Sequence, residues 1–145
     1  MANEINEAVA GLGRMLEAVE GLRIYDRPPE MLNELPCAVI HFVGRDFDET
    51  LGGSTFVGML RLTIFAATGE AAEAWTHLYE YLGATGPRSI ERAVDADNTW
   101  VGSVDVGRCR RVENVGVRQL PGAQGEPPTP VLAADIILSF IKSVS

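Results

Sequence analysis

The segment from residue 55 to residue 66 is the feature that most constrains the fold, because its side chains alternate with a period of two. The even positions are apolar or small: Phe56, Gly58, Leu60, Leu62, Ile64 and Ala66. The odd positions mix polar side chains with Val57, Met59 and Phe65. A β-strand places these two sets on opposite faces. The sequence therefore predicts a strand with one core face and one half-polar face.

Two further segments have the apolar spacing of helices that lie on a sheet. In residues 4–20, Asn3 is a plausible N-cap and Gly21 a plausible stop. Gly11 and Gly13 weaken this helix, so packing must hold it in place. Residues 70–82 form the second predicted helix, and Ser89 is expected to cap a short third helix that reaches about residue 96.

The remaining apolar segments are predicted strands at residues 22–25, 37–43 and 131–141, with a buried helix as the alternative for the last. Residues 103–119 predict one or two strands, and the apolar phase slips near Glu113-Asn114, which indicates a bulge or a turn. Residues 44–54 and 120–130 are predicted loops. We expect one α+β domain over residues 1–145, with a mixed or antiparallel sheet of about five strands and two main helices on one face.

Charge is unevenly distributed along the chain. The net charge is -8, yet the arginines Arg108, Arg110, Arg111 and Arg118 cluster in the last third of the sequence. Strand alternation predicts Arg108 and Arg110 on one side and Arg111 on the other, so they do not form one basic stripe. The acidic balance argues against nucleic-acid binding, and we expect salt bridges, within or between subunits, to occupy this cluster.

Nothing in the sequence predicts membrane insertion or export. No apolar run approaches the length of a membrane helix, and the first residues lack the basic and apolar regions of a signal peptide. Cys37 and Cys109 are too few for a disulfide framework. We therefore expect a protein that is made and kept in the cytosol.

No catalytic, cofactor or metal signature stands out. Cys37 and His41 share a strand face but lie too far apart to share a metal or a proton, and we expect His77 at the surface of its helix. The acidic segment 46–57 lacks the glycine and the closing glutamate of an EF-hand, and Gly11-Leu12-Gly13 lies inside a helix rather than after a strand. The sequence predicts no catalytic residue, no cofactor and no metal, and hence no enzyme.

The second face of the central strand predicts an interface instead. If Val57, Met59 and Phe65 lie on the outer side of the sheet, a monomer would expose more apolar surface than solubility favours. Together with the basic cluster this gives the candidate interface residues Val57, Met59, Phe65, Arg108, Arg110 and Arg111.

Three segments resemble a known family. They are Gly21-Leu22-Arg23-Ile24-Tyr25-Asp26 followed by Pro28-Pro29, then Pro36-Cys37-Ala38-Val39-Ile40, and Gly86-Pro87-Arg88-Ser89-Ile90 with Ala93. In sequence and in order they are similar to the tail terminator proteins of long-tailed bacteriophages of GC-rich hosts. Residues 108–129 depart most from that pattern.

The resemblance implies a structural virion protein without catalytic residues. Such a subunit forms a hexameric ring on the head-proximal end of the tail tube, stops tube growth and offers a joining surface to the head connector. The implied partners are other copies of the chain, the tail tube protein and the neck proteins, and DNA passes through the lumen without specific binding. The loops 44–54 and 120–130 are the candidate axial contacts.

Two alternatives remain open from the sequence. The chain could be another neck protein, for head completion or connector joining. It could also be a small-ligand-binding or enzymatic α+β domain with a pocket near Trp75, Tyr79 and His41.

Overall fold

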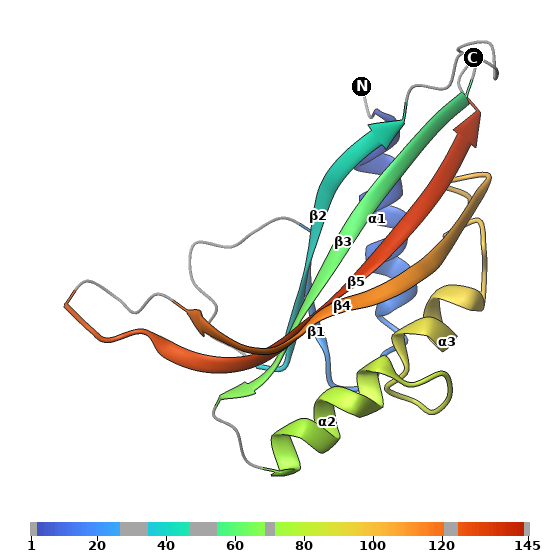
Figure 1. The fold of residues 1–145 in the computed structure, drawn as a ribbon. Coiled ribbons are helices and arrows are strands. Elements are labelled where there is room, and N and C mark those ends of the chain that lie inside the picture. The colour runs from blue at the N-terminus through green and yellow to red at the C-terminus, as the bar shows by residue number, and fades with distance from the viewer. Residues whose placement is uncertain (1–2, 27–34, 47–54, 69–71, 121–124, 144–145) are drawn as a thin grey trace.

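The computed structural model of the chain describes residues 3–26, 35–46, 55–68, 72–120 and 125–143. The elements follow one another in the order α1, β1, β2, β3, α2, α3, β4 and β5. Figure 1 shows them as one α+β domain with the strands in front and the helices behind and below. The predicted fold class is therefore confirmed.

Within the described residues the sheet has five strands, in the spatial order β1-β2-β3-β5-β4. Their bounds are Arg23–Tyr25 for β1, Cys37–Asp46 for β2, Thr55–Thr68 for β3, Val106–Leu120 for β4 and Thr129–Ser143 for β5. β1 runs parallel to β2 and the other pairs are antiparallel, so the sheet is mixed. β1 and β4 form its two edges.

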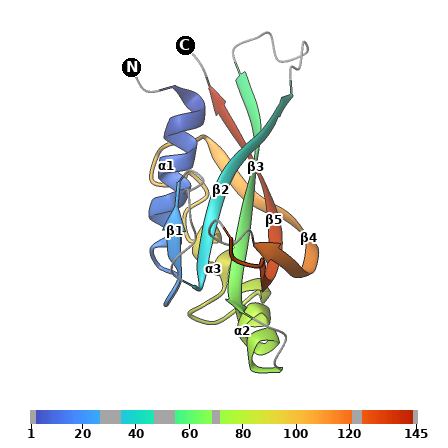
Figure 2. The same cartoon turned by 90° about the vertical axis from the view of Figure 1, so that its left-hand side faces the viewer.

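The alternation along β3 separates the two faces as predicted. Leu60, Leu62 and Ile64 are fully buried and belong to one core with Leu12 of α1 and Leu78 of α2. Helix α1 spans Glu4–Leu16 and helix α2 spans Ala72–Leu82. Figure 2 shows α1 beside the sheet and α2 below it, and the shared core places both helices on the same face of the sheet. Because burying one such side chain stabilises a fold by about 1.5–3 kcal/mol, this layer dominates the stability.

Helix α1 begins where the sequence predicts and ends earlier. The Asn3 Oδ1 atom accepts a hydrogen bond from the Asn6 N–H at 2.8 Å, which caps the helix. After Leu16 the chain continues in tighter turns, in which the Val19 N–H bonds the Leu16 carbonyl at 3.0 Å. The prediction that the α-helix reaches residue 20 is therefore wrong. The i to i−3 turns that follow Leu16 still bury Val19.

The two glycines of α1 have different surroundings. A Cβ atom on Gly11 would lie 2.0 Å from the Ser103 Oγ atom and 2.5 Å from the Trp100 carbonyl oxygen. A Cβ atom on Gly13 would meet nothing within 4 Å. The close approach of the turn at residues 97–104 therefore requires glycine at position 11, whereas no contact requires it at position 13.

Helix α3 (Ile90–Asp95) begins with the predicted cap. The Ser89 Oγ atom accepts from the Arg92 N–H at 3.1 Å and donates to the Gly83 carbonyl at 2.6 Å. One side chain thus joins the end of α2 to the start of α3. Gly86 has a φ of 101°, which explains glycine in the turn between them.

β4 is a single strand with two irregularities. The predicted one lies between Glu113 and Gly116, where Asn114 has a φ of 56°. The other lies between Cys109 and Arg111, and the sequence did not indicate it.

The unpredicted bulge changes which way Arg111 faces. Arg108 pairs with Ser139 and Arg111 with Ile137, two positions that share one face of β5. Arg108 and Arg111 therefore lie on the same, helix-free face, and the prediction of opposite sides is wrong. The extra residue, Arg110, takes up the shift in register.

Several predicted boundaries also change. Residues 44–46 belong to β2, residue 120 to β4 and residues 129–130 to β5, so both predicted loops are shorter where they are described. The alternative of a buried helix near the C-terminus is wrong, because β5 pairs with β3 on one side and β4 on the other. Pro28-Pro29, residues 47–54, residues 70–71 and residues 121–124 lie outside the described residues.

Candidate functional site

The helix-free face holds a groove of about 420 Å³ near the start of β4. Val57 and Met59 of β3 and Arg108 and Arg110 of β4 line it, together with Ile141 of β5. Four of the six predicted interface residues are thus brought together by the pairing of β3 and β4 with β5 between them. The result is a surface that combines apolar side chains with positive charge.

The other two predicted interface residues lie elsewhere. Phe65 shares the face but sits farther along β3, opposite Ala133, and Arg111 forms an ion pair with Glu113 at 2.9 Å. Val57, Met59 and Phe65 all lie on the helix-free face, and each is half-buried. Directly opposed residues on β5 cover part of each side chain.

The arginines of β4 divide into two kinds. Arg111 and Arg118 have acidic partners in the chain, which confirms the expectation of salt bridges for these two. Within the described residues, Arg108 and Arg110 form neither an ion pair nor a hydrogen bond, and both are exposed. For them a salt bridge between subunits stays a prediction.

A buried carboxylate lies at the centre of the same face. Asp135 of β5 is only 3% exposed. It accepts hydrogen bonds from Thr63 Oγ1 at 2.8 Å and from Asn114 Nδ2 at 3.0 Å, and Arg118 Nη2 lies 3.0 Å away. Arg118 also donates to the Asn114 carbonyl at 3.1 Å. The carboxylate thereby fixes the second bulge of β4 onto β5.

These contacts set the charge state of Asp135. Burial alone would raise the pKa of its carboxyl group, but hydrogen bonds from Arg118, Asn114 and Thr63 outweigh burial and hold the pKa below its ordinary value. Asp135 therefore stays ionised at neutral pH. A buried, fully bonded carboxylate of this kind is a structural element rather than a free acid or base.

The two histidines do not form a catalytic arrangement with each other. His41 lies opposite Arg61 on the helix-free face. Burial and the positive charge of Arg61 lower its pKa, and the negative charge of Asp135 raises it less. His77 lies on α2, where its Nδ1 atom is 2.9 Å from the Arg88 guanidinium and its Nε2 atom 3.7 Å from Glu73.

The alternative pocket near Trp75, Tyr79 and His41 is not formed. Trp75 packs against the core on the helix side, and its ring centroid lies 5.7 Å from that of Tyr79. His41 lies on the opposite face of the sheet, so the sheet itself separates it from α2. This prediction is wrong because the alternation of β2 turns His41 away from the helices.

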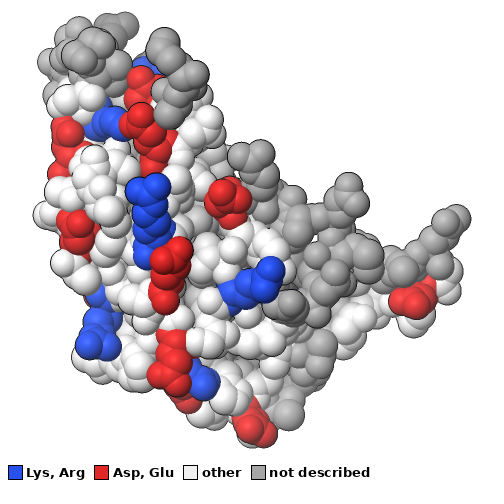
Figure 3. Space-filling view, turned by 180° about the vertical axis from the view of Figure 1, so that it is seen from behind, with Lys and Arg blue, Asp and Glu red and all other residues white. Residues whose placement is uncertain are grey.

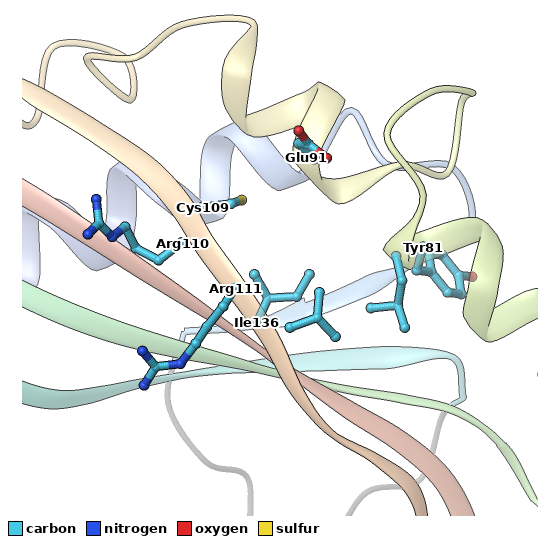
Figure 4. Close-up of a pocket in the computed structure, with 8 residues that line it drawn as sticks. Tyr81, Glu91, Cys109, Arg110, Arg111 and Ile136 are labelled. Carbon is cyan, nitrogen blue, oxygen red and sulfur yellow. The ribbon is translucent and has the colours of Figure 1, made fainter.

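A second cavity, of about 160 Å³, lies between α2, α3 and β4. Figure 4 shows Tyr81, Glu91 and Cys109 around it, while Arg110 and Arg111 extend away from Tyr81. Burial, with the negative charges of Asp95 and Glu91, raises the pKa of the Cys109 thiol to about 12. Because the thiolate is the reactive form, this cysteine is inert at neutral pH.

Two findings concern metals and membranes. Among the described residues, no three side chains of the metal-binding types converge. Over the same ranges, none of the helices combines the length and the apolar character needed to cross a bilayer. The acidic segment 46–57 falls mostly outside the described residues.

A groove at the other edge of the sheet was not predicted from the sequence. It measures about 520 Å³ and lies between α1 and β1, lined by Ala10, Gly13, Glu17, Leu22, Ile24 and Asp26. Ala10 and Gly13 of α1 and Glu17, just after its end, follow one another at intervals of three and four residues. This spacing puts them on one stripe and was the available signal. Figure 3, which shows the helix side, has acidic and basic side chains interspersed rather than gathered in one patch.

The buried Asp135 network was also missed. Its signal was a single acid within the apolar run from Val131 to Leu138.

No protein-family model matches the chain, and no curated protein shows significant similarity to it. The function is therefore argued from the two sheet edges and the surfaces that they carry.

Proposed function

We propose that the chain is a structural subunit of a phage virion, a tail terminator that closes into a ring on the head-proximal end of the tail tube. The observation that carries the proposal is that the two edges of one sheet present different exposed surfaces. Two unlike surfaces on one subunit are what a head-to-tail ring requires. We infer that the ring is a tail terminator from the three segments that resemble that family.

The fold supports this reading of those segments. Gly86 and Ser89 form the turn and the cap that join α2 to α3, and the Glu20 N–H bonds the Pro87 carbonyl at 3.1 Å. The third resembling segment therefore joins α2 to α3 and bonds the chain that follows α1. A rigid scaffold of this kind suits a protein that acts by binding, since capping a tube needs affinity and no bond is made or broken.

In this proposal the ring binds the exposed end of the tail tube and offers a different surface to the head connector. It resides in the virion, at the neck of the tail, after assembly in the host cytoplasm. Six copies form the ring. DNA passes through its lumen without specific contacts, because the net charge of -8 opposes phosphate binding.

Tail length measured by electron microscopy tests the proposal. Phage that lack the protein should assemble tails longer than normal and without heads, because nothing stops tube growth. Headless tails of normal length would point to another neck protein, such as a connector-joining component. Complete, infectious virions without the protein would refute both.

A further inference from the structure

The edge strand β4 exposes charged and apolar side chains. Arg108 and Arg110 have no ionic or hydrogen-bonding partner among the described residues, and they follow Val106, which is 36% exposed on the same face as Arg108. Within the described chain β4 pairs only with β5, so its other side is open. An open strand edge presents unpaired backbone N–H and C=O groups that can pair with another chain.

The opposite edge carries a groove of complementary character. Leu22 and Ile24 give the α1–β1 groove apolar walls, and Glu17 gives it negative charge. Glu17 is exposed and has no ion pair with any described residue. Gly13, which would have open space around a Cβ atom, leaves the groove unfilled.

From these observations, and resting on the proposed ring, we infer that the β4 edge of one copy docks into the α1–β1 groove of a second copy. Arg108 and Arg110 then face Glu17, and Val106 meets the apolar walls. Figure 2 shows α1 with β1 on one side of the molecule and β4 on the other. Because the two surfaces are different and lie on opposite sides, each copy keeps one surface free for the next, and the chain of contacts closes into a ring.

A second copy is the occupant that the charges favour. The positive edge and the negative groove belong to the same chain, so identical copies satisfy both at once without another partner. Charge complementarity of this kind fixes which surfaces meet and in which orientation.

Charge reversal at each surface tests the contact. The variants Arg110→Glu and Glu17→Arg are prepared separately and sized by analytical ultracentrifugation beside the wild-type chain. Each variant should fail to form rings, with a dissociation constant raised at least about tenfold. A matched control, Glu73→Arg on the exposed surface of α2, should assemble like the wild-type chain.

Mixing the two variants separates a head-to-tail contact from a symmetric one. The Glu17→Arg copy keeps an intact β4 edge, the Arg110→Glu copy keeps an intact groove, and the two reversed charges complement each other, so an equal mixture should form rings in which the two variants alternate. The double variant in a single chain should recover rings, because its reversed charges face each other again. Rings formed by each single variant alone would overturn the inference.

A steric test is independent of charge. Gly13→Leu should fill the groove and abolish ring formation, while Gly13→Ala should preserve it. Both variants favour the helix over glycine, so circular dichroism and the melting temperature should show intact folds. Rings formed by Gly13→Leu would overturn the inference.

Different results would refute the docking contact and the tail terminator function. Wild-type rings that persist in every variant would place the contact elsewhere and leave the tail terminator proposal standing. A wild-type chain that stays monomeric at about 1 mM would overturn the docking contact. Normal tails in phage that lack the protein would overturn the proposed function, whatever the variants do.

Discussion

At the residue scale, the most consequential side chain is Asp135. An aspartate in the middle of an apolar strand is costly to bury unless hydrogen bonds and an opposite charge compensate it. Thr63, Asn114 and Arg118 provide this compensation from the two neighbouring strands. The residue therefore determines how β4 bends against β5.

Replacing Asp135 by alanine should destabilise the chain by about 3–5 kcal/mol, because Arg118 would be left beside a buried site without its counter-charge. Urea denaturation of the purified variant measures this. Glu113→Ala serves as the control, since its ion pair with Arg111 is exposed and contributes less than about 1 kcal/mol. Equal effects of the two substitutions would contradict the role given to Asp135.

The pKa of Asp135 also predicts an acid sensitivity. Its pKa is lower in the folded state than its ordinary value of 3.8, so the folded state binds the proton less readily than the unfolded state. The stability that it contributes is complete above that value and is lost as the pH falls through the folded pKa. The difference in unfolding free energy between the wild-type chain and Asp135→Asn should therefore be constant from pH 7 to about 5 and shrink below about pH 4. A difference that does not change down to pH 2 would be inconsistent with ionised Asp135.

At the scale of elements, α1 and β4 differ in how they obtain their shape. The apolar stripe and the cap of α1 are local features of its sequence. The bends of β4 depend on its pairing with β5. The shift in the alternation of apolar residues along its sequence therefore indicated one bulge but not the other. The bulge between Cys109 and Arg111, which the sequence did not indicate, decides which face of the sheet Arg111 occupies.

The two glycines of α1 give a matched prediction. Gly11→Ala should destabilise the chain by about 1–3 kcal/mol, because its Cβ atom would overlap the Trp100 carbonyl oxygen and Ser103. Gly13→Ala should stabilise it by up to about 1 kcal/mol, because alanine is the better helix former and the space is open. Thermal unfolding of both variants gives the comparison, and effects of the same sign would contradict it.

At the scale of the whole molecule, the sheet separates two kinds of surface. The core lies on the helix side, and the helix-free face collects Arg61, Arg108, Arg111 and Arg118 in register. Three of these arginines lie beside an acidic side chain of the same face: Arg111 beside Glu113, and Arg61 and Arg118 beside Asp135. The face therefore carries less free positive charge than its sequence composition indicates.

This distribution predicts weak binding to nucleic acid. At about 0.15 M salt the chain should bind duplex DNA more weakly than a dissociation constant of about 10⁻⁴ M, since few unpaired basic groups are available to neutralise phosphates. Fluorescence anisotropy with a labelled duplex measures the affinity. Micromolar binding that falls steeply with added salt, and that is lost on replacing Arg108 and Arg110 by alanine, would contradict the prediction.

The sequence by itself determined the elements whose causes are local. The period of two fixed β3 and its core face, the spacing of three and four fixed α1 and α2, and Asn3 and Ser89 fixed two helix starts. Each of these depends on side chains that are neighbours along the chain.

The tertiary structure alone decided what depends on residues distant in sequence. The order of strands made β1 and β4 the edges, the first bulge turned Arg111 back to the face of Arg108, and the sheet separated His41 from α2. Asp135 is bound by Arg118, Asn114 and Thr63, which lie 17, 21 and 72 residues away along the chain. Strand pairing is set by the packing of the whole sheet, and a one-residue shift reverses every side chain beyond it, so no local pattern could place the two docking surfaces.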